Sequence, residues 1–131
     1  MWRYFNNNPT GNRTTDCAVR AIAAAFNVTW DDAFDALARN AKRVGDMMHS
    51  DRVWGDLLRQ YGFTKEIVPD SCPDCYTLRD FSKDHPKGVF VVKTPEHVVS
   101  VVDGDIYDSF DSSGETPIFF WRRDRNTRRK N

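Results

Sequence analysis

The chain has 131 residues, of which 40% are hydrophobic, and it carries 19 basic and 19 acidic side chains. This length and composition suit one domain with a single modest core and leave too little apolar material for two. No apolar run approaches the ~20 residues that a membrane helix needs, and the N-terminal residues lack the apolar segment of a signal peptide. We therefore expect a cytoplasmic protein with no membrane contact.

The charges are unevenly distributed along the chain. Residues 122–131 hold six basic groups and one acidic group, so residues 1–121 carry a net charge of −5. We predict one domain over residues 1–121, followed by a basic tail over residues 122–131. Such a tail is typical of a frayed, solvated terminus, and it is also compatible with binding to nucleic acid or to an acidic partner.

Helical periodicity dominates the first half of the chain. Apolar residues at i, i+3, i+4 and i+7 predict a short buried helix over residues 16–26, with Thr15 or Asp16 as its N-cap. Thr29 caps a second helix that ends near Gly45. The side chains expected to face the core are Val19, Ile22, Ala23 and Phe26 in the first helix and Trp30, Phe34, Leu37 and Ala41 in the second.

Two more helices are predicted before the pattern changes. One runs from about Ser50 to Tyr61 and stops at Gly62, and a short one begins at Thr77, where the sequence resembles a capping box. The third helix is expected to bury Val53, Trp54, Leu57, Leu58 and Tyr61.

The second half of the chain is rich in β-formers. Four runs separated by Pro, Gly, Asp and Ser predict an antiparallel meander of about four strands. Helices followed by strands indicate an α+β fold in which N-terminal helices pack on a C-terminal sheet. The four runs are residues 89–92, 97–102, 106–110 and 118–121.

Three side chains have the residue types and the order of a cysteine hydrolase site. Cys17 opens the first predicted helix, where the helix dipole stabilises a thiolate, and His97 and Asp108 follow on consecutive strands. A two-residue turn at Asp103-Gly104 would place His97 and Asp108 on one face as diagonal neighbours. Taken singly, each of these residues could also have a purely structural role. Cys17 could be a buried core residue, His97 a histidine packed in the core or at a strand edge, and Asp108 a residue that closes a turn.

The chain also resembles a family of small phage and bacterial papain-like cysteine peptidase domains. The resemblance lies in residues 8–11, in Asp16-Cys17-Ala18-Val19-Arg20-Ala21, in Trp30, and in residues 97–104 followed by Tyr107-Asp108. It implies a papain-like α+β fold. It also implies that Cys17 is the nucleophile, His97 the general base and acid, and Asp108 the residue that orients His97.

The better-known papain pattern has a glutamine six residues before the nucleophile, which donates to the oxyanion, and this chain has Gly11 there. An amide from Asn8 or Asn12 is a candidate substitute, and Asn8 is favoured because Asn12 is next to Arg13. We expect Arg20 to form an exposed i,i+4 pair with Asp16.

Cys72 and Cys75 have the spacing of half a zinc site or of a redox dithiol. The chain has no second such pair, so we treat them as weak metal candidates and expect two loop thiols and no cofactor. The chain has three cysteines, and this odd number fits reduced thiols better than the disulfide framework of a secreted protein.

The sequence therefore predicts a papain-like cysteine hydrolase that cleaves a peptide or isopeptide bond in a protein or peptide substrate through a thioester. One alternative is a catalytically silent module of the same fold that binds a protein partner. Another is a nucleic-acid-associated phage protein that uses the arginine-rich tail.

Overall fold

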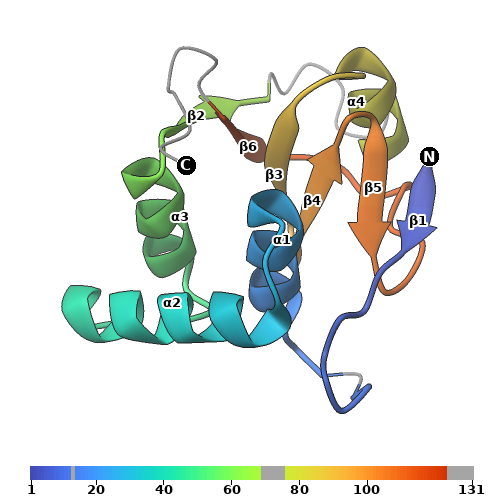
Figure 1. Cartoon of the computed structure of the whole chain (residues 1–131). Helices are drawn as coiled ribbons and strands as arrows, with labels where there is room; N and C mark the ends of the chain where they lie inside the picture. The colour runs from blue at the N-terminus through green and yellow to red at the C-terminus, as the bar shows by residue number, and fades with distance from the viewer. Residues whose placement is uncertain (13, 69–75, 124–131) are drawn as a thin grey trace.

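The computed structural model describes residues 1–12, 14–68 and 76–123. These residues form four helices and one six-stranded mixed sheet (Figure 1). In chain order the elements are β1 (Trp2–Tyr4), α1 (Cys17–Phe26), α2 (Trp30–Val44), α3 (Asp51–Gln60), β2 (Phe63–Ile67), α4 (Leu78–Asp84), β3 (Val89–Thr94), β4 (His97–Val102), β5 (Asp105–Asp108) and β6 (Phe119–Arg123).

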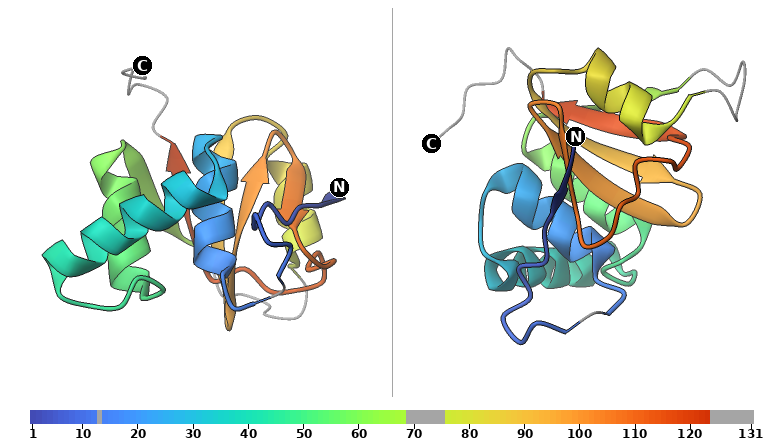
Figure 2. Two further views of the ribbon diagram at one scale, coloured as in Figure 1. Left: turned by 60° about the horizontal axis from the view of Figure 1, so that its bottom comes forward. Right: turned by 90° about the vertical axis from the view of Figure 1, so that its right-hand side faces the viewer.

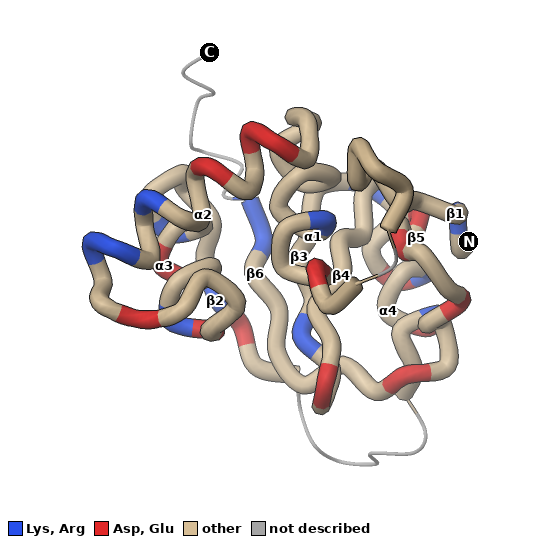
Figure 3. Tube along the Cα trace, turned by 90° about the horizontal axis from the view of Figure 1, so that it is seen from below, with Lys and Arg blue, Asp and Glu red and all other residues tan. Residues whose placement is uncertain are grey.

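The four predicted helices are confirmed, and side-chain capping explains the starts of α2, α3 and α4. Thr29 and Ser50 accept hydrogen bonds at the starts of α2 and α3, and Gly45 ends α2 in the left-handed conformation. Thr77 and Asp80 form the predicted capping box of α4, with each side chain satisfying the other residue's backbone N–H. Acidic residues lie at the start of α2 and basic residues at its end, as the helix dipole favours (Figure 3).

The sheet differs from the predicted four-stranded meander. Its strand order is β1-β5-β4-β3-β6-β2, and every pair is antiparallel except β1 with β5. Only β3, β4 and β5 form a meander, because β6 returns across the sheet to pair with β3. The strands β1 and β2 were not predicted, and β5 ends at Asp108 rather than at Phe110. Strand β6 extends through Arg122 and Arg123, the first two residues of the predicted tail.

The helices cover both faces of the sheet. The views of Figure 2 show α1, α2 and α3 on one face and α4 on the other. The larger core lies under α1, α2 and α3 and includes Leu37, Trp54 and Trp121, whereas the smaller core joins α4 to the opposite face through Phe81 and Phe120.

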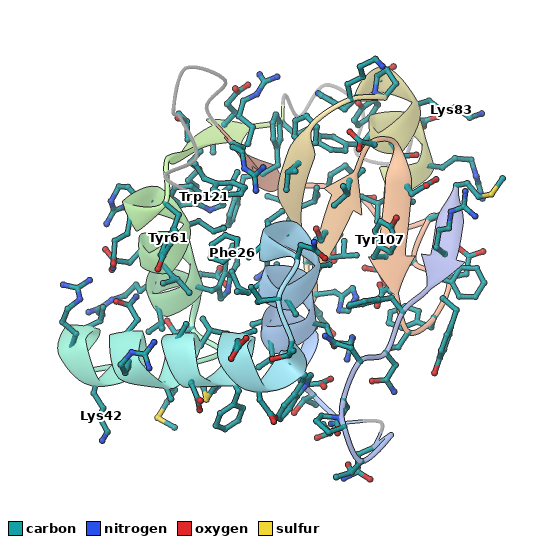
Figure 4. The ribbon with its side chains drawn as sticks, in the orientation of Figure 1. Phe26, Lys42, Tyr61, Lys83, Tyr107 and Trp121 are labelled. Carbon is teal, nitrogen blue, oxygen red and sulfur yellow. The ribbon has the colours of Figure 1, made fainter. Side chains whose placement is uncertain are left out.

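Two residues expected in the core are at the surface. The side chain of Tyr61 is 59% exposed and that of Phe34 is 38% exposed. Tyr61 lies at the end of α3, where its ring packs at 5.0 Å on Phe26 at the rim of the core (Figure 4). Phe34 packs at 5.1 Å on Trp30, along the outer edge of the apolar face of α2. Both aromatic rings cover neighbouring rings and leave their other sides in solvent.

Candidate active site

Cys17 is the first residue of α1, and Asp16 is its N-cap. The carboxylate of Asp16 makes no capping hydrogen bond, because its two oxygens accept from Arg20 and, at 2.8 Å, from the indole Nε1 of Trp30. The thiol of Cys17 is half-buried and packs against the larger core. It therefore lies at the positive end of a helix dipole, where a thiolate is favoured.

His97 and Asp108 come together across a tight hairpin. The turn between β4 and β5 consists of Asp103 and Gly104, whose φ angles are 49° and 84°, as a two-residue hairpin turn requires. This is the register in which His97 and Asp108 are diagonal neighbours. The imidazole Nε2 of His97 lies 2.7 Å from Oδ2 of Asp108. Since Nε2 is occupied, Nδ1 is the ring nitrogen left for the hydrogen bond between His97 and Cys17.

The surroundings of Cys17 favour its ionised form. Burial alone would raise the pKa of the thiol, but hydrogen bonds from His97 and from the backbone N–H of Val98, together with the charges of His97 and Arg20, lower it below its ordinary value. Burial alone would lower the pKa of the His97 imidazole. The hydrogen bonds and charges of Asp108 and Cys17 outweigh burial and raise this pKa to about 9. The two opposite shifts favour a thiolate beside an imidazolium at neutral pH.

Asp108 is buried and surrounded by donors. Its side chain accepts from Ser112 Oγ at 2.6 Å, from the backbone N–H of Ser109 at 2.8 Å and from Arg20 Nη2 at 3.4 Å, in addition to His97. Burial alone would raise the pKa of this carboxyl group, but the hydrogen bonds from His97 and Ser112 offset burial and lower it. Asp108 therefore remains a carboxylate that holds the imidazole in one orientation.

Three of the surrounding residues were missed or misread from the sequence. The pair between Arg20 and Asp16 is present, but it is buried rather than exposed, and Arg20 also reaches Asp108. Ser112 lies in the segment after β5 and showed no sequence signal. The ring of Phe110 lies 5.0 Å from that of His97 and remains 41% exposed, so it forms an apolar wall beside the imidazole.

A cleft of about 580 Å³ adjoins the start of α1. Asp16 and Ala18, the two sequence neighbours of Cys17, line it, and Trp30, Phe34 and Met48 form an apolar wall. The oxyanion candidates Asn8 and Asn12 also line this cleft.

The two candidate amides differ in how they are held. Asn8 is half-buried, and its Oδ1 accepts from the N–H and the hydroxyl of Thr10 at 2.9 and 2.8 Å, which leaves the amide NH₂ group as a donor. Asn12 is exposed; its backbone carbonyl accepts from the side-chain amide of Asn6, and its backbone N–H donates to Oγ1 of Thr10 at 3.4 Å, while its side-chain amide has no hydrogen bond among the described residues. Asn8 is therefore the better oriented of the two side chains.

Cys72 and Cys75, the weak metal candidates, lie outside the described residues. Within residues 1–12, 14–68 and 76–123, no group of three or more His, Cys, Asp or Glu side chains is placed to hold a metal ion. Over the same residues, no helix has the length and apolar character needed to cross a membrane.

Comparison with known protein families, with curated proteins and with solved structures found no match for this chain. The geometry of the site itself therefore carries the functional assignment.

Proposed function

We propose that this protein is a papain-like cysteine hydrolase that cleaves a peptide or isopeptide bond in a protein or peptide substrate. The observation that supports this most strongly is the hydrogen-bonded series from Cys17 through His97 to Asp108, made by residues of α1, β4 and β5. A helix-borne thiol facing an imidazole that a carboxylate orients is the arrangement required for nucleophilic catalysis by cysteine.

In the first half of the reaction, the thiolate of Cys17 attacks the carbonyl carbon of the scissile bond and forms a tetrahedral intermediate. When this intermediate collapses, the C–N bond breaks, and the proton on Nδ1 of His97 passes to the leaving amine. The products of this half-reaction are the free amine and a thioester on Cys17. The carboxylate of Asp108, 2.7 Å from Nε2, keeps Nδ1 directed at the thiol.

In the second half, neutral His97 removes a proton from a water molecule, whose oxygen attacks the thioester carbonyl. The C–S bond then breaks, a carboxylic acid leaves, and Cys17 returns to the thiolate beside the imidazolium. No metal or organic cofactor takes part in this sequence of steps.

The oxyanion requires donors near the thiol. We assign one donor to the backbone N–H of Cys17 in the first turn of α1 and the other to the side-chain amide of Asn8. Cys17 and His97 are not among the residues that line the cleft, so we assign to it the part of the substrate beside the scissile bond, with apolar groups against Trp30 and Phe34.

The test is the pH dependence of Cys17 alkylation by iodoacetamide, followed by peptide mass spectrometry in the wild type and in His97→Ala. Cys72 and Cys75 serve as internal controls in the same sample. We expect Cys17 to react below pH 7 far faster than the two control thiols, and to slow when His97 is replaced. A slow Cys17 that is indifferent to His97→Ala would contradict the proposal and favour a protein-binding module with a catalytically silent site.

The nucleic-acid alternative remains a prediction about the basic C-terminal tail, whose residues 124–131 lie outside the described ones. Because Arg122 and Arg123 belong to β6, the appropriate truncation removes residues 124–131 only. Salt-dependent binding to nucleic acid that this truncation abolishes would support the alternative. Binding that is absent, or that survives the truncation, would exclude a role for these residues.

A further inference from the structure

Arg20 links the first turn of α1 to the strand that carries Asp108. Its side chain is only 8% exposed, and its guanidinium pairs with Asp16 through Nη1 and with Asp108 through Nη2. The two carboxylate partners are themselves 5% and 2% exposed. Because Arg20 follows Cys17 by three residues, the same helical turn presents both the thiol and the cation that contacts Asp108.

Stability alone gives a weak account of this arrangement. Taking charges out of water costs several kcal/mol per ion, and apolar side chains of similar volume are often as stable as a buried ion pair. The Nε of Arg20 is also buried and has no hydrogen-bond partner among the described residues, which adds a further cost. A buried cation with an unmet donor therefore calls for an explanation beyond folding.

Asp16 is fixed from a second side. The indole of Trp30, the first residue of α2, donates to Oδ2 of Asp16 at 2.8 Å, while Oδ1 of Asp16 accepts from Arg20. With both oxygens bonded, the carboxylate of Asp16 is held where it pairs with Arg20, and the hydrogen bond from Trp30 ties this pair to the start of α2.

The charges around the thiol alternate in sign. Cys17 and Asp108 are the negative partners of His97, and Arg20 lies between Asp108 and Asp16. These groups come from α1 and its cap, from β4 and from β5, while α2 contributes the neutral indole of Trp30. Without Arg20, the buried carboxylates of Asp16 and Asp108 would lose the cation that lies between them.

We propose that Arg20, held in place by Asp16, is a positioning residue that fixes the carboxylate of Asp108 for its contact with His97. This inference rests on the proposed cysteine hydrolase function, since its consequence is the reactivity of Cys17. Arg20 touches neither the substrate nor the reacting atoms; apart from the direct effect of its charge on the pKa of the Cys17 thiol, it acts through Asp108.

The experiment measures the pH profile of Cys17 alkylation in Arg20→Met, Asp108→Asn and the double variant, on protein shown to be folded by circular dichroism. We expect Arg20→Met to shift the profile upward by about one pH unit, which slows Cys17 by about tenfold on the acid side of the profile, where the thiolate is the minor form. Because most of the effect of Arg20 passes through Asp108, adding Arg20→Met to Asp108→Asn should slow the reaction much less than Arg20→Met does in the wild type.

Two further variants separate positioning from a general effect. Arg52→Met removes an exposed arginine of α3 and should leave the profile unchanged. Arg20→Lys keeps the charge but loses the planar fork that spans two carboxylates, so it should slow Cys17 by roughly threefold. Arg20→Lys also keeps the proposal testable if Arg20→Met does not fold.

The outcomes distinguish this inference from the proposed function. If wild-type Cys17 is reactive and folded Arg20 variants match it, the positioning role is overturned and the hydrolase proposal stands. Equal slowing by Arg20→Met with and without Asp108→Asn would also overturn it, because Arg20 would then act independently of Asp108. If wild-type Cys17 reacts no faster than Cys72 and Cys75, the function itself fails.

Discussion

Two histidines of this chain lie in opposite kinds of surroundings. His97 belongs to a polar network with Asp108 and Cys17, at the ends of β4 and β5. His85, at the end of α4, stacks at 4.0 Å on Phe81 and contacts Phe90, and its Nδ1 is bonded to the backbone carbonyl of Phe81.

The neighbours of each histidine decide its role. A ring packed among phenylalanines with one nitrogen on a carbonyl serves as a flat, half-polar packing residue. A ring between a carboxylate and a thiol is held as a proton donor and acceptor. We therefore treat the polar network as the candidate catalytic region and the aromatic cluster of Phe81, His85, Phe90 and Phe120 as a stability element.

The largest contrast is expected between His97→Ala and His85→Ala. Removing His97 should lower hydrolysis by about 10⁴-fold or more, because the thiolate loses its partner and the leaving amine its proton donor. Removing His85 should destabilise the protein and leave the turnover of folded enzyme within about twofold, since among the described residues the contacts of His85 are with Phe81, Phe90 and Phe120 and not with the site. Turnover of a peptide substrate and urea unfolding measure the two effects. Equal losses of turnover would contradict the division into two regions.

Phe120→Ala should break the aromatic cluster without disturbing the polar network. The ring of Phe120 lies 4.9 Å from that of Phe81 and 6.0 Å from that of Phe90, and it is 6% exposed. Its removal should lower the free energy of unfolding by about 3–5 kcal/mol. Urea denaturation measures this loss, and Cys17 alkylation below the transition should match the wild type. A change in the alkylation profile of the folded variant would show that the two regions are coupled.

The pH profile of hydrolysis sharpens the assignment of His97. Activity should rise with pH as Cys17 ionises, below the ordinary thiol pKa, and it should fall above pH 9. The sign of the second limb follows from the raised pKa of His97: the imidazolium that protonates the amine persists up to about pH 9 and is lost above it. Asp108→Asn removes the main partner that raises this pKa, so its alkaline limb should move to lower pH. If the alkaline limb of Asp108→Asn matches that of the wild type, Asp108 does not act on His97.

Ser112→Ala should give the smallest of these effects. The hydroxyl of Ser112 donates to Asp108 at 2.6 Å, and a hydrogen bond to a charged group contributes about 1.5–3 kcal/mol. We expect a loss of about that size in the free energy of unfolding and a fall of several fold in Cys17 reactivity at pH 7. Ser113→Ala is the matched control, because Ser113 bonds Arg79 instead. If both variants behave alike, Ser112 does not act on Asp108.

Much of the local structure was predictable because its causes are local. Thr29, Ser50 and Thr77 cap helices within their own first turns, and the Asp103-Gly104 turn carries its own conformational preference. The unpredicted strands have weak signals of their own. Strand β1 has three residues, and β2 is an edge strand whose partner β6 begins more than 50 residues later. Their pairing is decided by which sheet edge each strand reaches, which no local pattern encodes.

The sequence by itself determined the helices, their caps, the β4–β5 hairpin, and therefore the shared face of His97 and Asp108. The tertiary structure decided that the Cys17 thiol meets this face, that Arg20 reaches a carboxylate 88 positions away, and that Ser112 and Phe110 complete the surroundings. The physical reason is the sequence separation over which each kind of interaction acts. Capping and turn preferences act over about four residues, whereas the pairing of buried charges depends on elements that meet only when α1 packs on the sheet.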